Sequence, residues 1–164
     1  MMPPDNSPHI RFAKPEDGQA IAHLFYDTVH EVNCRDYNIE QVDAWAPHRE
    51  DTAKWIARQK QFTTFVVERE GQIAGFAELD LLANPGRIDC FYVHKDFQRT
   101  GSGSLLMSQL KTTAVDSGIR TLTAEVSITA LPFFQRHQFE IIQKQEVTRQ
   151  NVLFINYLMK CPLK

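Results

Sequence analysis

Residues 97–106, Phe-Gln-Arg-Thr-Gly-Ser-Gly-Ser-Leu-Leu, place small residues at the junction of two expected elements. They follow an apolar run over 88–93 and open an amphipathic stretch that ends near Gly118, which predicts a strand, a loop and a helix. The first N–H groups of a helix have no partner within it, and the helix dipole favours an anion there. Gly101 and Gly103 let a ligand approach the backbone closely. The segment therefore predicts a cradle for a phosphate-bearing ligand.

Two common phosphate-binding loops do not match this segment. A P-loop needs a Lys directly after its second glycine, and the first Lys after Gly103 is Lys111. A dinucleotide-binding fingerprint needs a third glycine at a position that Leu106 occupies here. What is left is Gln98-x-x-Gly101-x-Gly103 after a strand that ends at Val93.

This pattern resembles the pyrophosphate loop of the GNAT superfamily, the coenzyme-A-dependent N-acetyltransferases, whose consensus is Gln/Arg-x-x-Gly-x-Gly/Ala. The resemblance covers roughly residues 9–160 and implies acetyl-CoA as the cofactor. It also implies that backbone N–H groups of residues 99–104 hold the pyrophosphate, and that the pantetheine arm runs along strand 88–93 like an added strand. The Val93 N–H would then donate to the oxyanion that forms on the thioester.

Residues 123–139 look like a second family segment, Asn-x-x-Ala-x-x-Phe-Tyr-x-x-x-Gly-Phe. The matching residues are Ala130, Phe133 and Phe139. Ser127 stands where Asn is common and Gln138 where Gly is common; the Asn position often touches the pantetheine arm, as the Ser127 hydroxyl could. Phe134 stands where a Tyr often protonates the departing thiolate, and it cannot donate a proton. Residues 37–47, residues 127–134 and the Val32-Asn33 pair resemble a bacterial branch of the family, the YafP-like acetyltransferases.

The resemblance therefore implies a set of cofactor-binding residues on the strand, the loop and the second segment. They are Phe91, Tyr92, Val93, Gln98, Arg99, Thr100, Gly101, Ser102, Gly103, Ser104, Ser127 and Phe134.

Two acids among apolar neighbours are candidates for the base that takes a proton from the attacking amine. Glu78 lies in the strand-like segment 74–79 and Asp89 in the cofactor strand. The alternative is that each is a solvated acid on the sheet or a partner for Arg87. Cys90 is disfavoured as a nucleophile because nothing basic adjoins it in the sequence, and a buried thiol is expected.

The pocket for the acceptor amine is expected from the first two helices and the loop that joins them. Its candidate residues are Tyr26, His30, Asp36, Tyr37 and Trp45. Core packing is an equal alternative for Trp45, and a surface position for His30.

The periodicity of hydrophobic residues predicts a mixed α/β sheet, and the element order is also that of the GNAT fold. Strands are expected over 9–14, 64–68, 73–82, 88–93, 122–126, 140–149 and 152–159. Helices are expected over 15–32, 39–45, 52–60 and 129–136, and from just after Gly103 to Gly118. The terminal strand Val152–Met159 could pair across a homodimer, so monomer and homodimer both stay open.

Bulk composition is that of one globular domain over residues 9–164, after a loose Pro-rich tail at residues 1–8. A net charge of −2 without a basic block argues against nucleic acid as the partner. No apolar run reaches the roughly 18–20 residues of a membrane span, and no signal peptide is evident, so a cytoplasmic location without membrane attachment is expected. The cysteines and histidines have no metal-ligand spacing, so no metal site is assigned.

The leading hypothesis is direct acetyl transfer from acetyl-CoA to the amine of a small molecule or peptide. A non-catalytic acyl-CoA-binding sensor is the second hypothesis, motivated by Phe134. The third is an acyltransferase that uses a bulkier acyl group or an O-acceptor.

Overall fold

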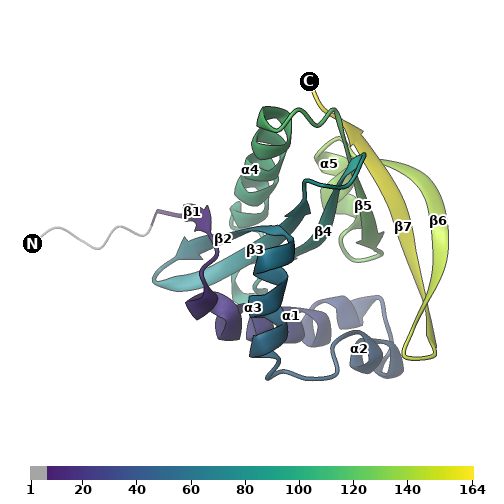
Figure 1. Cartoon of the computed structure of the whole chain (residues 1–164). Helices are drawn as coiled ribbons and strands as arrows, with labels where there is room; N and C mark the ends of the chain where they lie inside the picture. The colour runs from purple at the N-terminus through teal and green to yellow at the C-terminus, as the bar shows by residue number, and fades with distance from the viewer. Residues whose placement is uncertain (1–6) are drawn as a thin grey trace, which may run out of the picture.

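The computed structural model describes residues 7–164, so the first six residues of the expected tail lie outside the described residues. One sheet spans the molecule, with the strand order β1-β2-β3-β4-β5-β7-β6 (Figure 1). Its strands are β1 (His9–Phe12), β2 (Thr63–Arg69), β3 (Gln72–Asp80), β4 (Gly86–Val93), β5 (Thr121–Ser127), β6 (Glu140–Arg149) and β7 (Val152–Pro162). Only β4 and β5 pair in parallel; the other neighbours are antiparallel.

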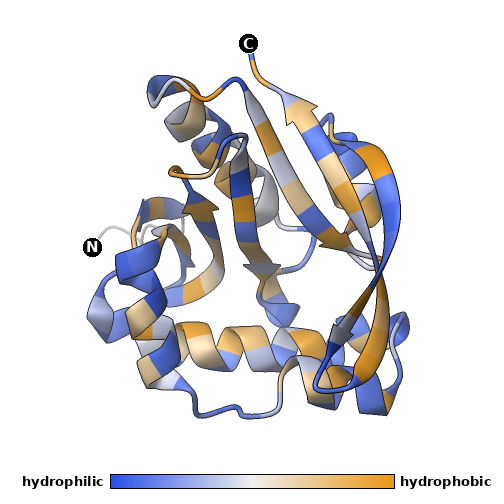
Figure 2. Cartoon of the chain, turned by 45° about the vertical axis from the view of Figure 1, so that its right-hand side comes forward, coloured by the Kyte–Doolittle hydropathy of each residue, from blue (hydrophilic) through white to orange (hydrophobic). Residues whose placement is uncertain are grey.

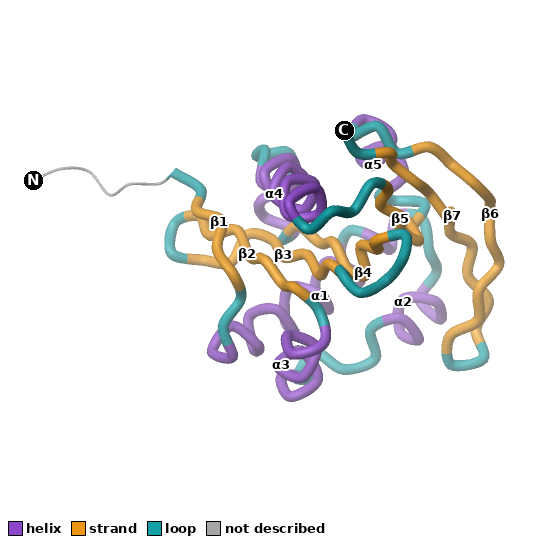
Figure 3. The backbone as a smooth tube through the Cα atoms, turned by 45° about the horizontal axis from the view of Figure 1, so that its top comes forward, coloured by secondary structure: helices purple, strands orange, loops and turns teal. Residues whose placement is uncertain are grey.

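Helices cover both faces of the sheet (Figure 3). One face carries α4 (Ser102–Asp116) and α5 (Leu131–Arg136), and the other carries α1 (Gly18–Glu31), α2 (Ile39–Trp45) and α3 (Thr52–Gln61). Short 3-10 turns lie at Pro15–Asp17, Asn33–Arg35 and Lys95–Phe97. None of the helices within residues 7–164 combines the length and apolarity that crossing a bilayer requires.

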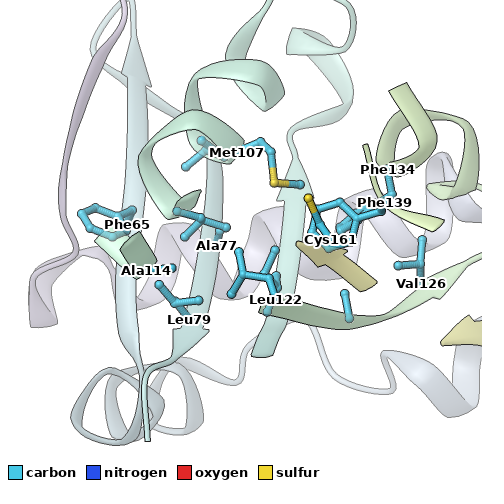
Figure 4. Packing of buried hydrophobic residues seen from close by; sticks show 14 of the residues in the cluster. Phe65, Ala77, Leu79, Met107, Ala114, Leu122, Val126, Phe134, Phe139 and Cys161 are labelled. Carbon is cyan, nitrogen blue, oxygen red and sulfur yellow. The ribbon is translucent and has the colours of Figure 1, made fainter. Parts of the chain in front are cut away.

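Two hydrophobic clusters hold the helices to the sheet. Under α4, Phe65, Ala77, Leu79 and Leu122 form one buried cluster together with Met107 (Figure 4). The second cluster packs α1 against the other face of the sheet, through Val66 and Phe76 among others. Because side chains alternate across a strand, neighbouring residues of β2 contribute to opposite faces of the sheet. Along β5, hydrophobic and polar residues alternate, as the colours in Figure 2 show.

The central strands β4 and β5 pair only over Gly86–Ile88 and Leu122–Ala124, and then separate. A bulge accompanies the separation: the register with β3 passes from Leu79–Ile88 to Glu78–Cys90, which leaves Asp89 as an extra residue. The main-chain N–H and C=O groups of β4 beyond Ile88 therefore form no hydrogen bonds with β5. This opening is the structural basis of the site described below.

The mixed sheet predicted from the sequence is confirmed, with shifts at the element ends. The expected helix over 15–32 is divided into a 3-10 turn and α1, and β3 ends at Asp80 rather than at Leu82. The expectation that Val152–Met159 could pair across a dimer is wrong. Strand β7 pairs with β6 on one side and, over Asn156–Pro162, with β5 on the other. Beyond the end of β5, the Leu153 and Ile155 carbonyls accept from the side chains of Gln41 and Tyr37. The sheet ends at β1 and β6.

Candidate active site

The N-terminus of α4 forms an open cradle. Gly101 has φ +87, a left-handed conformation that favours glycine, and a Cβ placed on it would have nothing within 4 Å. The first hydrogen bond of the helix runs from Leu105 N–H to the Gly101 carbonyl at 3.1 Å, which leaves the N–H groups of residues 102–104 without an acceptor in the helix. At Gly103 a Cβ would lie 3.1 Å from the Phe133 ring and 3.4 Å from Val93 Cγ2, so glycine is what lets α4 approach β4 here.

Side chains of the loop divide into those that brace it and those that face the ligand. The Thr100 hydroxyl bonds the Phe97 carbonyl at 2.6 Å, and Arg69 of β2 donates to the Ser102 hydroxyl at 2.8 Å. Neither Thr100 nor Ser102 lines the cavity described next. The loop residues that do line it are Gln98, Arg99, Gly101, Gly103 and Ser104. Thr100 and Ser102 therefore hold the loop's shape rather than reach a ligand with their side chains.

A cavity of about 660 Å³ begins at this cradle and passes through the opening between β4 and β5. Its walls include residues 88–93 of β4, residues 124–127 of β5, and Phe133 and Phe134 of α5. The His94 N–H donates to the Ala74 carbonyl of β3 at 2.7 Å. Because successive N–H groups of a strand point to opposite sides, the Val93 N–H points away from β3, toward the opening. The Val93 carbonyl accepts from Gln98 Nε2 at 2.5 Å.

Glu78 and Asp89 meet at one arginine that sequence reasoning did not identify. Arg58 of α3 donates to Glu78 from Nε and Nη2, at 2.9 and 2.6 Å from Oε1, and its Nη2 also contacts the Asp89 carboxylate. Asp89 makes a second ion pair with Arg87, as the sequence alternative had suggested. Glu78 is only 1% exposed and does not line the cavity, whereas Asp89 does. The two acids are thus equivalent in charge but not in access.

The electrostatics of this cluster keep the arginine charged and the nearby thiol protonated. Burial alone would lower the pKa of Arg58, but the Glu78 hydrogen bond and the surrounding negative charges raise it. Burial raises the pKa of the Cys90 thiol well above its usual range, and the Glu78 charge adds to this. A thiol of that kind is a poor nucleophile.

Glu78, Asp89 and Cys90 also bring three possible metal ligands within 4.8 Å of one another. The Arg58 guanidinium, however, contacts all three of them, with its Nη2 at 3.6 Å from the Cys90 sulfur. A cationic side chain therefore already occupies the position that a metal ion would need, and we assign no metal to it.

The far end of the cavity has aromatic walls. Tyr37 and Trp45 line it, and their rings meet edge to face with centroids 5.3 Å apart. The Tyr37 hydroxyl donates to the Ile155 carbonyl at 2.7 Å and accepts from the Ile128 N–H at 3.0 Å, so it is held in place. Further aromatic residues on this wall are Phe25, Trp55, Tyr92 and Phe154.

The structure does not bring Tyr26, His30 or Asp36 to the cavity. The Tyr26 and His30 rings stack at 4.0 Å, and His30 Nε2 lies 2.8 Å from the Ala46 carbonyl. These contacts give His30 a structural role in joining α1 to the end of α2. The Asp36 carboxylate accepts from the Thr129 hydroxyl at 2.8 Å.

The second sequence segment forms the wall opposite β4. Phe134 is buried, with its ring 5.6 Å from Phe91 and 5.0 Å from Phe139, in an apolar cluster that offers no proton donor at this position. The Ser127 hydroxyl accepts from the Ala130 N–H at 3.1 Å and lies 3.5 Å from Asn33 Nδ2. Asn33 also lines the cavity, and sequence reasoning did not identify it as a site residue because its position beside Ser127 depends on tertiary packing.

Comparisons with known proteins agree with this geometry. The family model of the GNAT acetyltransferase domain matches residues 33–161. The uncharacterized N-acetyltransferase YafP of Escherichia coli (strain K12) is 28% identical over 155 residues, which cover 94% of this chain and 96% of that protein.

Solved structures share the fold. A GCN5-related N-acetyltransferase from Rhodopseudomonas palustris is 30% identical, with 96% of each chain covered and a TM-score of 0.88. The PaiA N-acetyltransferase of Thermoplasma acidophilum, solved in complex with coenzyme A, is 17% identical, with 95% of this chain and 99% of that chain covered and a TM-score of 0.77. At that identity it supports the fold alone. With the family model matching most of its length, this chain belongs to the GNAT acetyltransferase family and is an N-acetyltransferase that uses acetyl-CoA.

Proposed function

We propose that this enzyme transfers the acetyl group directly from acetyl-CoA to an amine held at the aromatic end of the cavity. The observation that carries the proposal is one continuous cavity, which joins the cradle at Gly101 and Gly103 to the aromatic walls through the opening between β4 and β5. A thioester in that opening would lie between a held cofactor and a held acceptor. The protonated Cys90 thiol argues against an acetyl-enzyme intermediate.

Cofactor binding is assigned to backbone and cationic groups. The free N–H groups of residues 102–104 would take the pyrophosphate, and Arg99 and Arg136, which are exposed and line this part of the cavity, would add charge. The pantetheine arm would pair with the main chain of residues 91–93. Ser127 lines the cavity across the opening, where its hydroxyl would lie near the arm.

Asp89 is our choice for the base because it is the acid of the cluster that reaches the cavity. It would accept the amine proton, directly or through water, as the nitrogen attacks the thioester carbon. The attack would form the C–N bond and an oxyanion that the Val93 N–H stabilises. Collapse of this intermediate would restore the C=O bond and break the C–S bond. Since Phe134 has no proton to give, the thiolate would leave as the anion or take its proton from water. Glu78 would act through Arg58, by holding that side chain against Asp89.

The test pairs calorimetric titration of acetyl-CoA with thiol release over an amine screen. We expect micromolar binding, and we expect Asp89→Asn to lower kcat by about 100-fold or more while the acetyl-CoA Kd changes little. Glu146→Gln, at an exposed acid of β6 that does not line the cavity, is the control and should keep wild-type kcat. Equal kcat in Asp89→Asn and wild type across pH would remove Asp89 as the base. Faster turnover with propionyl-CoA than with acetyl-CoA would favour the alternative of a bulkier acyl group.

A further inference from the structure

Two arginines at the aromatic end of the cavity have no acidic partner among residues 7–164. Arg35 and Arg149 both line the cavity, both are exposed, and neither forms an ion pair with the described acids. They differ in this from Arg58 and Arg87, whose charges are matched by Glu78, Asp89 and Asp80. The acids at the β4 bulge are therefore each held in an ion pair, whereas Arg35 and Arg149 form none with the described acids.

The strand register shows that Arg149 belongs to the cavity side of the β6–β7 hairpin. Arg149 pairs with Val152, and two and four residues earlier Val147 pairs with Phe154 and Gln145 with Asn156. Alternate residues of a strand share a face, so Arg149 lies on the same face as the buried Phe154. Figure 1 shows the end of this hairpin beside α2, where Gln41 Nε2 donates to the Leu153 carbonyl at 2.9 Å.

Arg149 acts electrostatically on two tyrosines of the cavity wall. Its positive charge reaches the hydroxyls of Tyr37 and Tyr92, where it opposes the rise in pKa that burial imposes on both. Asn156, also on the cavity wall, accepts from Gln145 Nε2 at 2.9 Å through its Oδ1. Its Nδ2 is consequently the part of the amide that can donate to a ligand.

We propose that the acceptor carries a carboxylate as well as its amine, and that Arg149 binds this carboxylate. The inference rests on the proposed function and adds the acceptor's chemical class. The arginine fork matches a carboxylate with two parallel hydrogen bonds. The remaining surface of the acceptor packs on the aromatic walls. This favours an amino acid with an apolar side chain, or one whose amine and carboxylate are joined by an apolar methylene chain.

The experiment compares each acid with its carboxamide, which keeps the amine and removes the negative charge. The pairs are phenylalanine, leucine, methionine and ε-aminocaproate with their carboxamides, measured for binding to the coenzyme-A-saturated protein and for acetylation by thiol release. We expect at least one acid to be preferred by about tenfold or more, since a hydrogen-bonded charge contributes that much. Arg149→Gln should abolish the preference, chiefly through KM, and Arg149→Lys should restore part of it.

The control is Lys144→Gln, which removes one positive charge from the opposite face of the same strand. It should keep the wild-type preference. The inference is overturned if none of the acids is preferred over its carboxamide in binding or turnover, or if the preference survives in Arg149→Gln. The acetyl-CoA titration separates the two levels: loss of cofactor binding defeats the proposed function, whereas normal cofactor binding without a preference for acids defeats only the assignment of Arg149.

Discussion

Gly101 and Gly103 serve the same loop for different physical reasons. Gly103 has no positive φ, but there is no room for a side chain at this position because Phe133 and Val93 lie against it. Gly101 has free space around it but a positive φ of 87. A side chain at Gly101 would cost backbone strain and would also project into the space where the phosphates are expected to bind. These two effects can be separated by comparison with another glycine.

We predict that Gly101→Ala weakens acetyl-CoA binding by about tenfold or more, because the added methyl group enters the anion cradle. Gly71 in the β2–β3 turn is the matched control, since its φ is +74 and a Cβ there also meets nothing within 4 Å. Both variants should lose about 1 kcal/mol of unfolding free energy through strain. Calorimetric titration should show weaker binding for Gly101→Ala alone; equal Kd values in the two variants would contradict the cradle.

Glu78 offers a prediction about stability that is independent of catalysis. Glu78→Gln should lower the free energy of unfolding by about 3 kcal/mol, because Arg58 would keep a half-buried charge without its main partner. Urea denaturation measures the difference. Glu50→Gln removes an exposed acid paired with His23 and should leave the urea midpoint unchanged. A midpoint for Glu78→Gln equal to that of Glu50→Gln would show that the cluster at the bulge does not stabilise the fold.

At the scale of elements, the sequence predicted the strands and helices well because their signals are local. Leu122, Ala124 and Val126 alternate, and Gly118 follows the end of α4 as predicted. The helix begins at Ser102, slightly before the start that was predicted after Gly103. The ion cluster was not predictable in this way. In the sequence, Arg58 is indistinguishable from any other polar residue of an amphipathic helix. It contacts Glu78, which lies 20 residues further along the chain, only because the fold brings α3 to β3.

The acceptor candidates show the same division between local and tertiary information. Tyr37 and Trp45 were predicted from residue type and reach the cavity, whereas Tyr26 and His30, predicted on the same ground, stack on each other away from it. Residue type identifies groups able to bind an amine, but the side of α1 that faces β4 is decided by packing. Arg149 carried no local signal, because its place depends on the β6–β7 register.

The N-terminal elements are joined by Asp17, whose carboxylate accepts from Arg11 of β1 at 2.7 Å and from the Lys14 N–H at 2.7 Å. Burial opposes ionisation of Asp17, but these hydrogen bonds outweigh it and hold its pKa below the ordinary value of 3.8. A carboxylate with a lowered folded-state pKa stabilises the fold at pH values above the unfolded pKa. That stabilisation is lost as the pH falls through the folded pKa.

We therefore predict that Asp17→Asn lowers the free energy of unfolding at pH 7 by about 1 kcal/mol, a value kept small because the pair is partly open to solvent. The difference in unfolding free energy between variant and wild type should shrink as the pH is lowered below about 4, because the wild-type Asp17 then becomes protonated and is neutral like asparagine. Urea denaturation at several pH values gives both curves. Asp116→Asn, at an exposed acid near the end of α4, should run parallel to wild type. Parallel curves for Asp17→Asn would contradict the lowered pKa.

At the scale of the whole molecule, the sheet consists of two parts that meet at a weak junction. Strands β1 to β4 form one antiparallel part and β5, β7 and β6 the other, and the parts share only three register pairs between β4 and β5. The opening in which we expect the cofactor to bind therefore also reduces the main-chain bonding across the centre of the sheet. A ligand that contacts both walls would compensate for this.

Acetyl-CoA should accordingly stabilise the whole fold, because its pantetheine arm would contact β4 while α5 and the end of β5 close the other wall. At 100 times its Kd, ligand binding adds about 2.7 kcal/mol, which raises the Tm of a chain of this size by roughly 5–10 °C. ATP at the same concentration provides phosphates without an arm and should raise the Tm far less. Scanning calorimetry of wild type and Gly101→Ala with each ligand measures these shifts. Equal shifts with ATP and acetyl-CoA would mean that the phosphates alone bind and that the opening between β4 and β5 does not hold the arm.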